Sequence, residues 1–272
     1  MRHQARHDGV TLVTGAAGGM GAAVAARLAE RGDRVALLDR DHKALEPVAE
    51  KLAHGAAPRP GRTTPDGACS LHVADVASRD QVEEAVRAVE EHQGPISALV
   101  NAAGVLHTGE LTDYDDEAWH HTLAVNTTGV FYTGRAVARR MKERRSGAIV
   151  TIASNAARVP RAHMGAYAAS KAASQMLTLS LGLELGPLGI RCNVVAPGST
   201  DTPMLRSMWS GDQDRAATLE GDPAAFRVGI PLGKVAVPDD IAHTVAFLLS
   251  PQASHITLAT VAVDGGAALG AA

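Results

Sequence analysis

Tyr167 and Lys171 are the residues whose types and spacing point most directly to chemistry. They are four residues apart in a stretch of helical composition, so both side chains are expected on one face of a helix. A tyrosine with its ordinary pKa of about 10 is a poor base at neutral pH. A neighbouring cation favours the phenolate and lowers that pKa, so we predict that Lys171 tunes Tyr167 to act as a general base.

Two further polar side chains, Asn126 and Ser154, complete the candidate catalytic set. Ser154 follows an apolar, strand-like run, at the sheet edge where ligands bind in α/β folds. Its hydroxyl can hold a substrate oxygen in line with the tyrosine. A Tyr and a Lys one helical turn apart are common on ordinary protein surfaces. The pair therefore indicates a catalytic site only in combination with Ser154 and with a glycine-rich turn near the N-terminus.

That turn, T-G-A-A-G-G-M-G, occupies residues 14–21, directly after a strand-like run and before a helical stretch. Small residues let the backbone approach a pyrophosphate, which the N-terminus of the following helix attracts. A plain tight turn is the alternative, but the strand–turn–helix context favours a dinucleotide site. The residues of this turn that we expect to contact the cofactor are Gly15, Gly19, Met20 and Gly21.

The ends of the next strand-like runs supply further candidate contacts to the dinucleotide. Asp39 ends the second run, where a carboxylate can accept hydrogen bonds from both ribose hydroxyls and repels a 2′-phosphate, which favours NAD over NADP. Arg40 is the complication, because a guanidinium could hold that phosphate. After the third and fourth runs, the expected cofactor contacts are Asp75, Val76, Asn101 and Gly104.

A sheet edge is needed to bring these residues together, and the chain has the pattern for one. Apolar, strand-like runs alternate with helical stretches over residues 1–272, which we interpret as one domain. This alternation predicts the α/β class, with a Rossmann-type, doubly wound parallel sheet of about seven strands and helices on both faces. The expected strands are Val10–Thr14, Arg34–Leu38, Ser70–Val73, Ala98–Asn101, Ala148–Ala153, Arg191–Val195 and Thr260–Val263, and the main helices are Met20–Arg31, Asp80–His92, Ala118–Lys142 and Tyr167–Leu185.

Two stretches depart from this alternation. Residues 54–68 are dense in Gly and Pro and are expected to form a mobile loop before the third strand. Residues 199–229 carry large apolar side chains among charged ones and are expected to form a lid over the substrate; packing on the core or on a neighbouring subunit is the alternative. With Met164, the apolar candidates for this lid are Met204, Leu205, Met208 and Trp209.

The composition argues against several other classes of protein. The formal net charge of -3 gives no broad basic surface for nucleic acid or lipid, and no apolar run is long enough to span a membrane. Cys69 and Cys192 are too few for a disulfide framework, and the chain starts without a recognisable signal peptide, which favours a cytoplasmic protein. The His, Cys and Glu residues show no metal-ligand spacing, so no metal is expected.

The motifs T-G-A-A-G-G-M-G, N-A-A-G, Y-A-A-S-K and P-G-S-T-D-T resemble those of the short-chain dehydrogenase/reductase family, over essentially the whole chain. The resemblance implies that Tyr167 is the catalytic base and that Lys171 is its electrostatic partner and a ribose anchor. It further implies that Ser154 orients the substrate and that Asn126 holds a proton-relay water.

The same resemblance extends to the last part of the cofactor site and to assembly. In the P-G-S-T-D-T segment it implies cofactor contacts by Pro197, Gly198 and Thr202, with Thr202 at the nicotinamide carboxamide. Members of the family are commonly homotetramers, so a homotetramer is expected here.

One branch of the family, the 2,3-dihydro-2,3-dihydroxybenzoate dehydrogenases, is similar in greater detail over most of residues 95–272. The similarity includes R-V-P-R-A-H-M-G-A-Y, G-I-P-L-G-K-V-A and the ending V-D-G-G-A-A-L-G-A. It implies NAD-dependent oxidation of a carboxylated cyclic diol to 2,3-dihydroxybenzoate, a precursor of catechol siderophores. The substrate carboxylate needs a cation, for which Arg161 is the first candidate and Arg158 the second. Met204 is expected beside the ring.

Other functions fit parts of the pattern. The chain could be a 3-oxoacyl-carrier-protein reductase or another cyclic-diol dehydrogenase; the former usually prefers NADP, so a cofactor titration separates them. From a different class, it could be a non-catalytic nucleotide-binding sensor. Such proteins usually lose the tyrosine or the lysine, and both are present here.

Overall fold

The computed structural model describes residues 9–55 and 69–270. Within them, seven parallel strands form one sheet in the order β3-β2-β1-β4-β5-β6-β9. These strands are β1 (Val10–Thr14), β2 (Arg34–Asp39), β3 (Cys69–Val73), β4 (Ile96–Asn101), β5 (Gly147–Ile152), β6 (Ile190–Pro197) and β9 (Thr260–Val263). The chain winds outward from β1 to β3, then crosses to β4 and winds the other way. This confirms the predicted Rossmann-type, doubly wound sheet.

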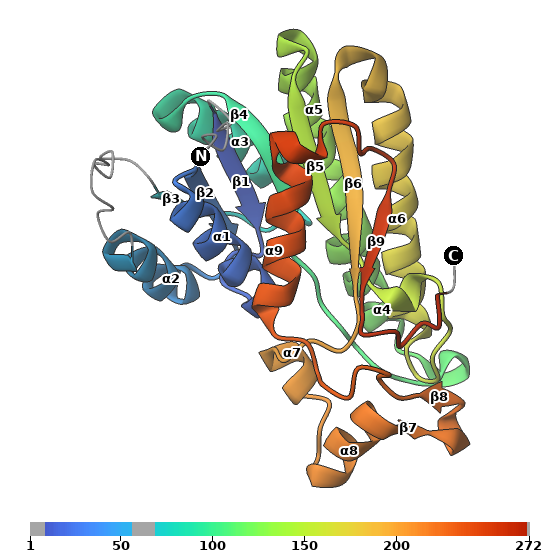
Figure 1. Cartoon of the computed structure of the whole chain (residues 1–272). Coiled ribbons are helices and arrows are strands. Elements are labelled where there is room, and N and C mark those ends of the chain that lie inside the picture. The colour runs from blue at the N-terminus through green and yellow to red at the C-terminus, as the bar shows by residue number, and fades with distance from the viewer. Residues whose placement is uncertain (1–8, 56–68, 271–272) are drawn as a thin grey trace.

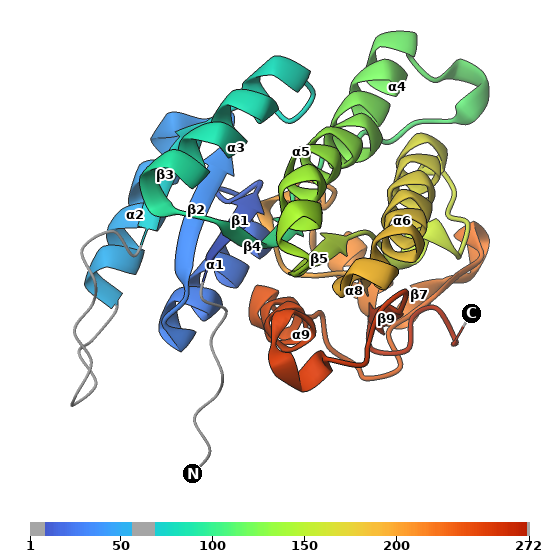
Figure 2. The same cartoon turned by 90° about the horizontal axis from the view of Figure 1, so that it is seen from above.

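Helices cover both faces of the sheet and give the molecule three layers (Figure 2). One layer consists of α1 (Gly19–Arg31), α2 (His42–Gly55) and α9 (Pro238–Leu249). The other consists of α3 (Arg79–Gln93), α4 (Asp116–Leu123), α5 (Gly129–Arg144) and α6 (Gly165–Leu185). The sheet therefore has a buried core on each side.

Alternate residues of the strands supply the two cores. Leu12 of β1 and Leu99 of β4 belong to the core under α3 and α5, whereas their neighbours Val13 and Val100 belong to the core under α1 and α9. All four side chains are fully buried. Successive side chains of a strand point to opposite faces, so strands covered on both faces must be apolar throughout. This is why the strand sequences show runs rather than alternation.

The predicted helix Ala118–Lys142 is interrupted. It begins as α4, passes through one π-helical turn at Ala124–Thr128, and continues as α5. Single π-turns inside helices are frequently found at functional sites. Asn126, one of the four candidate catalytic residues, lies in this turn.

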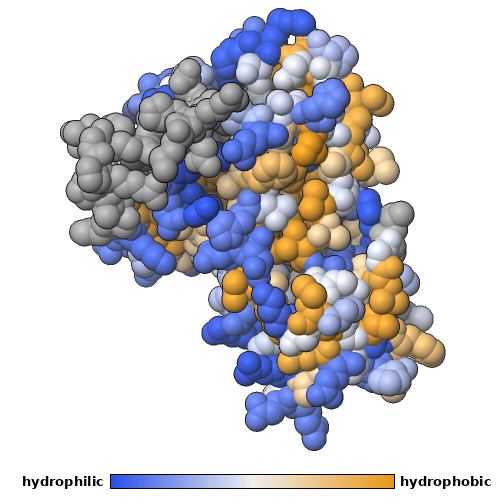
Figure 3. Space-filling view, viewed as in Figure 1, coloured by the Kyte–Doolittle hydropathy of each residue, from blue (hydrophilic) through white to orange (hydrophobic). Residues whose placement is uncertain are grey.

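A small lobe lies beyond the carboxyl ends of the strands (Figure 1). It comprises α7 (Pro203–Arg206), α8 (Asp212–Glu220) and a hairpin of β7 (Gly221–Asp222) and β8 (Arg227–Val228). The lobe projects from the body of the molecule and carries hydrophobic residues beside hydrophilic ones (Figure 3). It is built from the irregular stretch 199–229, which the sequence places near the substrate.

The predicted loop at 54–68 lies largely outside the described residues, because residues 56–68 are not described. Among the residues that are described, no helix is long and apolar enough to cross a membrane. Those same residues contain no group of three or more His, Cys, Asp or Glu placed to hold a metal ion.

Candidate active site

Ser154 and Tyr167 meet at the carboxyl end of β5. The strand ends at Ile152, and Ser154 then begins a short 3-10 turn in which its Oγ accepts a hydrogen bond from the backbone N–H of Ala156 at 3.1 Å. Tyr167 lies in the first turn of α6 with 9% of its surface exposed. The Ser154 side chain lies in the same pocket and lowers the pKa of Tyr167 as a hydrogen-bonding partner. The two hydroxyls that the sequence predicts to act together are therefore in one pocket.

Lys171 lies one turn further along α6, on the same face as Tyr167. Its Nζ is 5.8 Å from the Tyr167 ring centroid and donates a hydrogen bond to the carbonyl oxygen of Ile152 at 3.0 Å. Burial raises the pKa of Tyr167, and the hydrogen bond with Ser154 lowers it. The lowering of this pKa by Lys171 stays a prediction beside these two effects. Burial also lowers the pKa of Lys171 to about 8.

Asn126 is fully buried and is held by three hydrogen bonds. Its Nδ2 donates to the carbonyl oxygen of Val105 at 2.9 Å and to Ser170 Oγ at 3.0 Å, and its Oδ1 accepts from the N–H of Val105 at 2.8 Å. A side chain added at Gly104 would lie 3.2 Å from Lys171 Nζ and 3.3 Å from Asn126 Oδ1. Asn126 and Lys171 thus both lie next to Gly104, which follows β4.

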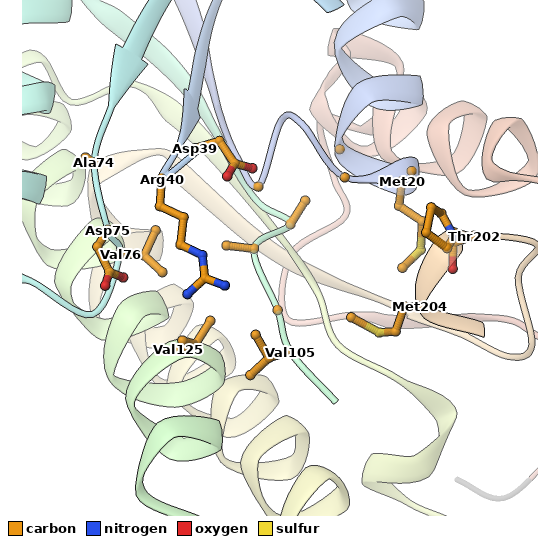
Figure 4. A pocket seen from close by; sticks show the side chains of 18 residues that line it. Met20, Asp39, Arg40, Ala74, Asp75, Val76, Val105, Val125, Thr202 and Met204 are labelled. Carbon is orange, nitrogen blue, oxygen red and sulfur yellow. The ribbon is translucent and has the colours of Figure 1, made fainter. Parts of the chain in front are cut away.

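A cavity at the carboxyl ends of β1, β2 and β4 matches the predicted dinucleotide site (Figure 4). From the glycine-rich turn it is lined by Gly15, Gly18, Gly19, Met20 and Gly21, from the strand ends by Asp39, Arg40, Ala74, Asp75, Val76 and residues 102–105, and further by Val125, Thr202, Pro203 and Met204. Nine of these eighteen residues are cofactor contacts that the sequence predicts. Arg40 extends into the cavity beside Asp75 and Val76 (Figure 4).

Two of the glycines are required by the folding of the turn itself. Gly15 has a positive φ of 64°, and a Cβ there would meet the backbone of Ala103 at 2.5 Å. A Cβ at Gly21 would lie 2.1 Å from the carbonyl oxygen of Gly15. A side chain at Gly15 would collide with the chain after β4, and one at Gly21 would push α1 away from the turn. The close approach keeps the N-terminus of α1 open toward the cavity, which is the arrangement that binds a pyrophosphate.

Asp39 is fixed at the end of β2 by its neighbours. Its Oδ2 accepts a hydrogen bond from the N–H of Ala17 at 3.1 Å, and its Oδ1 accepts one from the N–H of Asp41 at 3.2 Å. Asp75 is fixed in a similar way, because its Oδ1 accepts from the N–H of Ala77 at 2.9 Å. Both carboxylates line the cavity and fit the ribose and adenine ends of a dinucleotide. The residues present therefore fit a nicotinamide dinucleotide.

Three of the strand-end residues predicted to contact the cofactor lie elsewhere. The Asn101 side chain is buried on the α5–α6 side, where its Nδ2 donates to Thr151 Oγ1 and its Oδ1 accepts from Thr133 Oγ1. It does not line the dinucleotide cavity, because its amide is turned inward to these two threonines. Pro197 and Gly198 line the neighbouring pocket instead.

That neighbouring pocket contains the catalytic hydroxyls and is the candidate substrate site. Met20, Thr202 and Met204 line both cavities, so the two adjoin each other. Thr202 also begins α7, where its Oγ1 accepts a hydrogen bond from the N–H of Leu205 at 3.3 Å. The side chains that the sequence predicts for this pocket and that line it are Ser154, Arg161, Met164, Tyr167, Met204, Leu205 and Met208.

The structure distinguishes between the two arginines that are candidates for binding a substrate carboxylate. Arg161 lines the pocket, whereas Arg158 is exposed and does not. Trp209, a predicted lid residue, lines an adjoining outer cavity, and its Nε1 donates to Thr218 Oγ1 at 3.1 Å. Arg227 lines the pocket although sequence reasoning missed it. An isolated arginine in an irregular stretch gives no periodic signal, so only the folded hairpin reveals its position.

Comparison with known proteins agrees with this geometry. The sequence model of a family described as Enoyl-(Acyl carrier protein) reductase matches residues 15–268. The chain is 46% identical over 261 residues to 2,3-dihydro-2,3-dihydroxybenzoate dehydrogenase of Bacillus subtilis (strain 168), covering 96% of each chain. It is 43% identical over 260 residues to the enzyme of the same name from Escherichia coli (strain K12), covering 95% of this chain and 96% of the relative.

A solved structure extends the comparison to three dimensions. A single-substitution variant of actinorhodin polyketide ketoreductase, crystallised with NADPH, superposes with a TM-score of 0.84 at 33% identity, covering 96% of this chain and 97% of the other. Fold, site and sequence thus agree over almost the whole length. The chain belongs to the short-chain dehydrogenase/reductase family and is an oxidoreductase.

Proposed function

We propose that this enzyme oxidises a ring hydroxyl of 2,3-dihydro-2,3-dihydroxybenzoate with NAD and yields 2,3-dihydroxybenzoate, a precursor of catechol siderophores. One observation carries the proposal: the pocket that holds Ser154 and Tyr167 also holds the guanidinium of Arg161 and opens onto the dinucleotide cavity. A carboxylated cyclic diol has the complementary groups, a hydroxyl for the first pair and a carboxylate for the arginine. The names of the relatives from Bacillus subtilis and Escherichia coli support the same substrate.

The dinucleotide, when bound, accepts the hydride. The protein has to remove the hydroxyl proton and hold the ring in place. Tyr167 in its ionised form takes the proton, while the Ser154 hydroxyl holds the substrate oxygen beside it. Lys171 anchors the cofactor ribose, and Asn126 lies on the route by which the proton leaves toward solvent. The resulting ketone tautomerises to an aromatic ring, which favours oxidation.

The preference for NAD rests on Asp39. Its carboxylate lines the cavity at the end of β2 and is fixed there by two backbone N–H groups. A 2′-phosphate next to this charge would be repelled, whereas ribose hydroxyls can donate to it. The other cofactor contacts in this proposal are Gly15, Gly19, Met20, Gly21, Asp75, Val76, Gly104, Tyr167, Lys171 and Thr202.

The lobe at 199–229 is proposed as the substrate lid. Met204, Leu205 and Met208 reach the pocket from it, and flexible thioether side chains fill the irregular space around a ring. The carboxylate is assigned to Arg161 rather than to the exposed Arg158.

A homotetramer in the cytoplasm completes the proposal. Large apolar side chains are exposed on the outer helices, with Phe131 of α5 at 43%, Met176 of α6 at 60% and Leu183 of α6 at 71%. Exposed apolar residues grouped on neighbouring helices are typical of subunit contacts.

Product identification tests the proposal. The purified protein is incubated with 2,3-dihydro-2,3-dihydroxybenzoate and either NAD or NADP, and the products are separated by chromatography. We expect 2,3-dihydroxybenzoate with NAD and much less with NADP. Reduction of a 3-oxoacyl thioester with NADPH in place of this reaction would assign the chain to the reductases. Nucleotide binding without turnover of any substrate would indicate a sensor.

A further inference from the structure

The substrate pocket contains two positive charges and no negative one among the described residues that line it. Arg161 comes from the loop before α6, and Arg227 comes from β8 of the lobe hairpin. More than sixty residues separate them in sequence, and both are partly buried. They approach the same pocket as Ser154 and Tyr167. Two arginines from unrelated segments therefore line the pocket of the reacting hydroxyl.

Neither guanidinium forms a salt bridge with a described carboxylate. Arg161 Nη2 donates to Asn155 Oδ1 at 3.3 Å, and Arg227 Nη2 donates to Ser199 Oγ at 3.3 Å, so both bond neutral oxygens. Burial lowers the pKa of each, and the charge of Arg227 lowers the pKa of Arg161 further. Two like charges that are partly desolvated and unpaired are unfavourable without an anion between them.

Two carboxylates, those of Asp264 and Asp222, act on these arginines through their charge without forming a salt bridge. Asp264 raises the pKa of Arg161 by its charge, but its oxygens accept hydrogen bonds from Asn155 Nδ2 at 3.1 Å and from the backbone N–H groups of Gly266 and Ala268. Asn155 is thereby oriented with its Oδ1 toward Arg161. Asp222 exerts only a charge effect on Arg227. The arrangement leaves guanidinium donors available to a ligand.

We propose that Arg227 binds the substrate carboxylate together with Arg161, so that the lobe hairpin supplies half of the acid specificity of this pocket. A carboxylate has two oxygens with four lone-pair directions and can accept from both guanidinium groups at once. This assignment rests on the proposed function and names a residue beyond it. Because the carboxylate then contacts both the lobe and the body of the protein, its binding should also order the lobe over the ring.

The test compares the acid with the same cyclic diol lacking its carboxylate. Arg227→Gln should lower kcat/KM for the acid by about 10- to 100-fold, mainly through KM, because a hydrogen-bonded charge contact is lost. The kcat/KM for the neutral diol should stay within about twofold. Arg227→Lys should retain part of the preference for the acid. Arg215→Gln removes the same charge from an exposed site on α8 and serves as the matched control.

Inhibition provides a measurement that does not depend on turnover. The product 2,3-dihydroxybenzoate should inhibit Arg227→Gln more weakly than wild type, whereas catechol should inhibit both equally. An equal loss of kcat/KM toward both diols in Arg227→Gln would mean that Arg227 only supports the lobe. No loss of kcat/KM toward the acid would mean that Arg161 acts alone. Either result overturns the inference. If wild type fails to oxidise the acid at all, the proposed function fails instead.

Discussion

Lys171 Nζ donates a hydrogen bond to the carbonyl oxygen of Ile152 at 3.0 Å and so joins α6 to the end of β5. Ser154 and Tyr167 belong to these same two segments and meet two residues beyond Ile152. The lysine therefore has a positioning role that is visible in the structure, besides the role at the tyrosine that its spacing predicts and the role at the ribose that the family resemblance implies. Its ammonium group is held in a buried place, where burial lowers its pKa to about 8.

Lys171→Met should abolish most turnover without weakening the fold at neutral pH. The folded-state pKa of about 8 lies below the ordinary 10.5. Below pH 8 the buried ammonium therefore lowers the free energy of unfolding by about 3 kcal/mol, and this cost disappears as pH rises from 8 to 10.5. Methionine removes the cost but loses the hydrogen bond to Ile152. Thermal unfolding of both proteins should show Tm for the variant at least equal to wild type at pH 7, with a shrinking difference above pH 8. A large, pH-independent loss of Tm would contradict this.

Tyr167→Phe should lower kcat by at least about 100-fold, the usual contribution of a general base. Nucleotide binding should be nearly unchanged, since the cavity around the glycine-rich turn is intact. Steady-state kinetics and a fluorescence titration with the dinucleotide measure the two effects separately. Tyr132→Phe, on α5 beside Phe131, is the matched control and should keep wild-type rates. Full activity of the Tyr167 variant would remove this residue from the mechanism.

Ser154→Ala should move the pH profile of oxidation. The reaction needs ionised Tyr167, and the hydrogen bond from Ser154 lowers the pKa of that residue. Without it the pKa rises, so the ascending limb of log kcat/KM against pH shifts to higher pH, while the maximum also falls. The profile is to be recorded next to that of Ser146→Ala, an exposed serine before β5. An unshifted limb would show that Ser154 does not act on the tyrosine.

Asp39→Ser should change the cofactor preference. Removing the carboxylate removes the repulsion toward a 2′-phosphate, and Arg40 in the same cavity can then pair with it. We expect the ratio of kcat/KM for NADP to that for NAD to rise by at least about tenfold, since a like charge in contact costs several kcal/mol. Asp41→Asn changes the charge two residues away, outside the cavity lining, and should leave the ratio unaltered. A constant ratio in both variants would place the discrimination elsewhere.

Much of the fold was predictable because its signals are local. Continuous apolar runs identify strands covered on both faces, and the glycine-rich turn after β1 locates the dinucleotide cavity. The spacing of Tyr167 and Lys171 needs only helical periodicity. These features depend on residues that are close in sequence, where elementary geometry applies.

What could not be predicted depends on tertiary contacts. The direction of Asn101 follows from the register of β4, and its amide bonds Thr133 and Thr151 rather than facing the cavity. The surroundings of Lys171 follow from how α6 lies against β5. Arg227 reaches the pocket through a hairpin with strands of two residues each, too short to leave a pattern.

The most direct measurement of the central claim is the stoichiometry of one reaction. Wild-type protein, 2,3-dihydro-2,3-dihydroxybenzoate and excess NAD are mixed, and reduced cofactor and 2,3-dihydroxybenzoate are quantified over time. We expect equal amounts of both products, formed with a higher kcat/KM than with NADP. Absence of 2,3-dihydroxybenzoate with either cofactor, from protein that binds NAD, would contradict it.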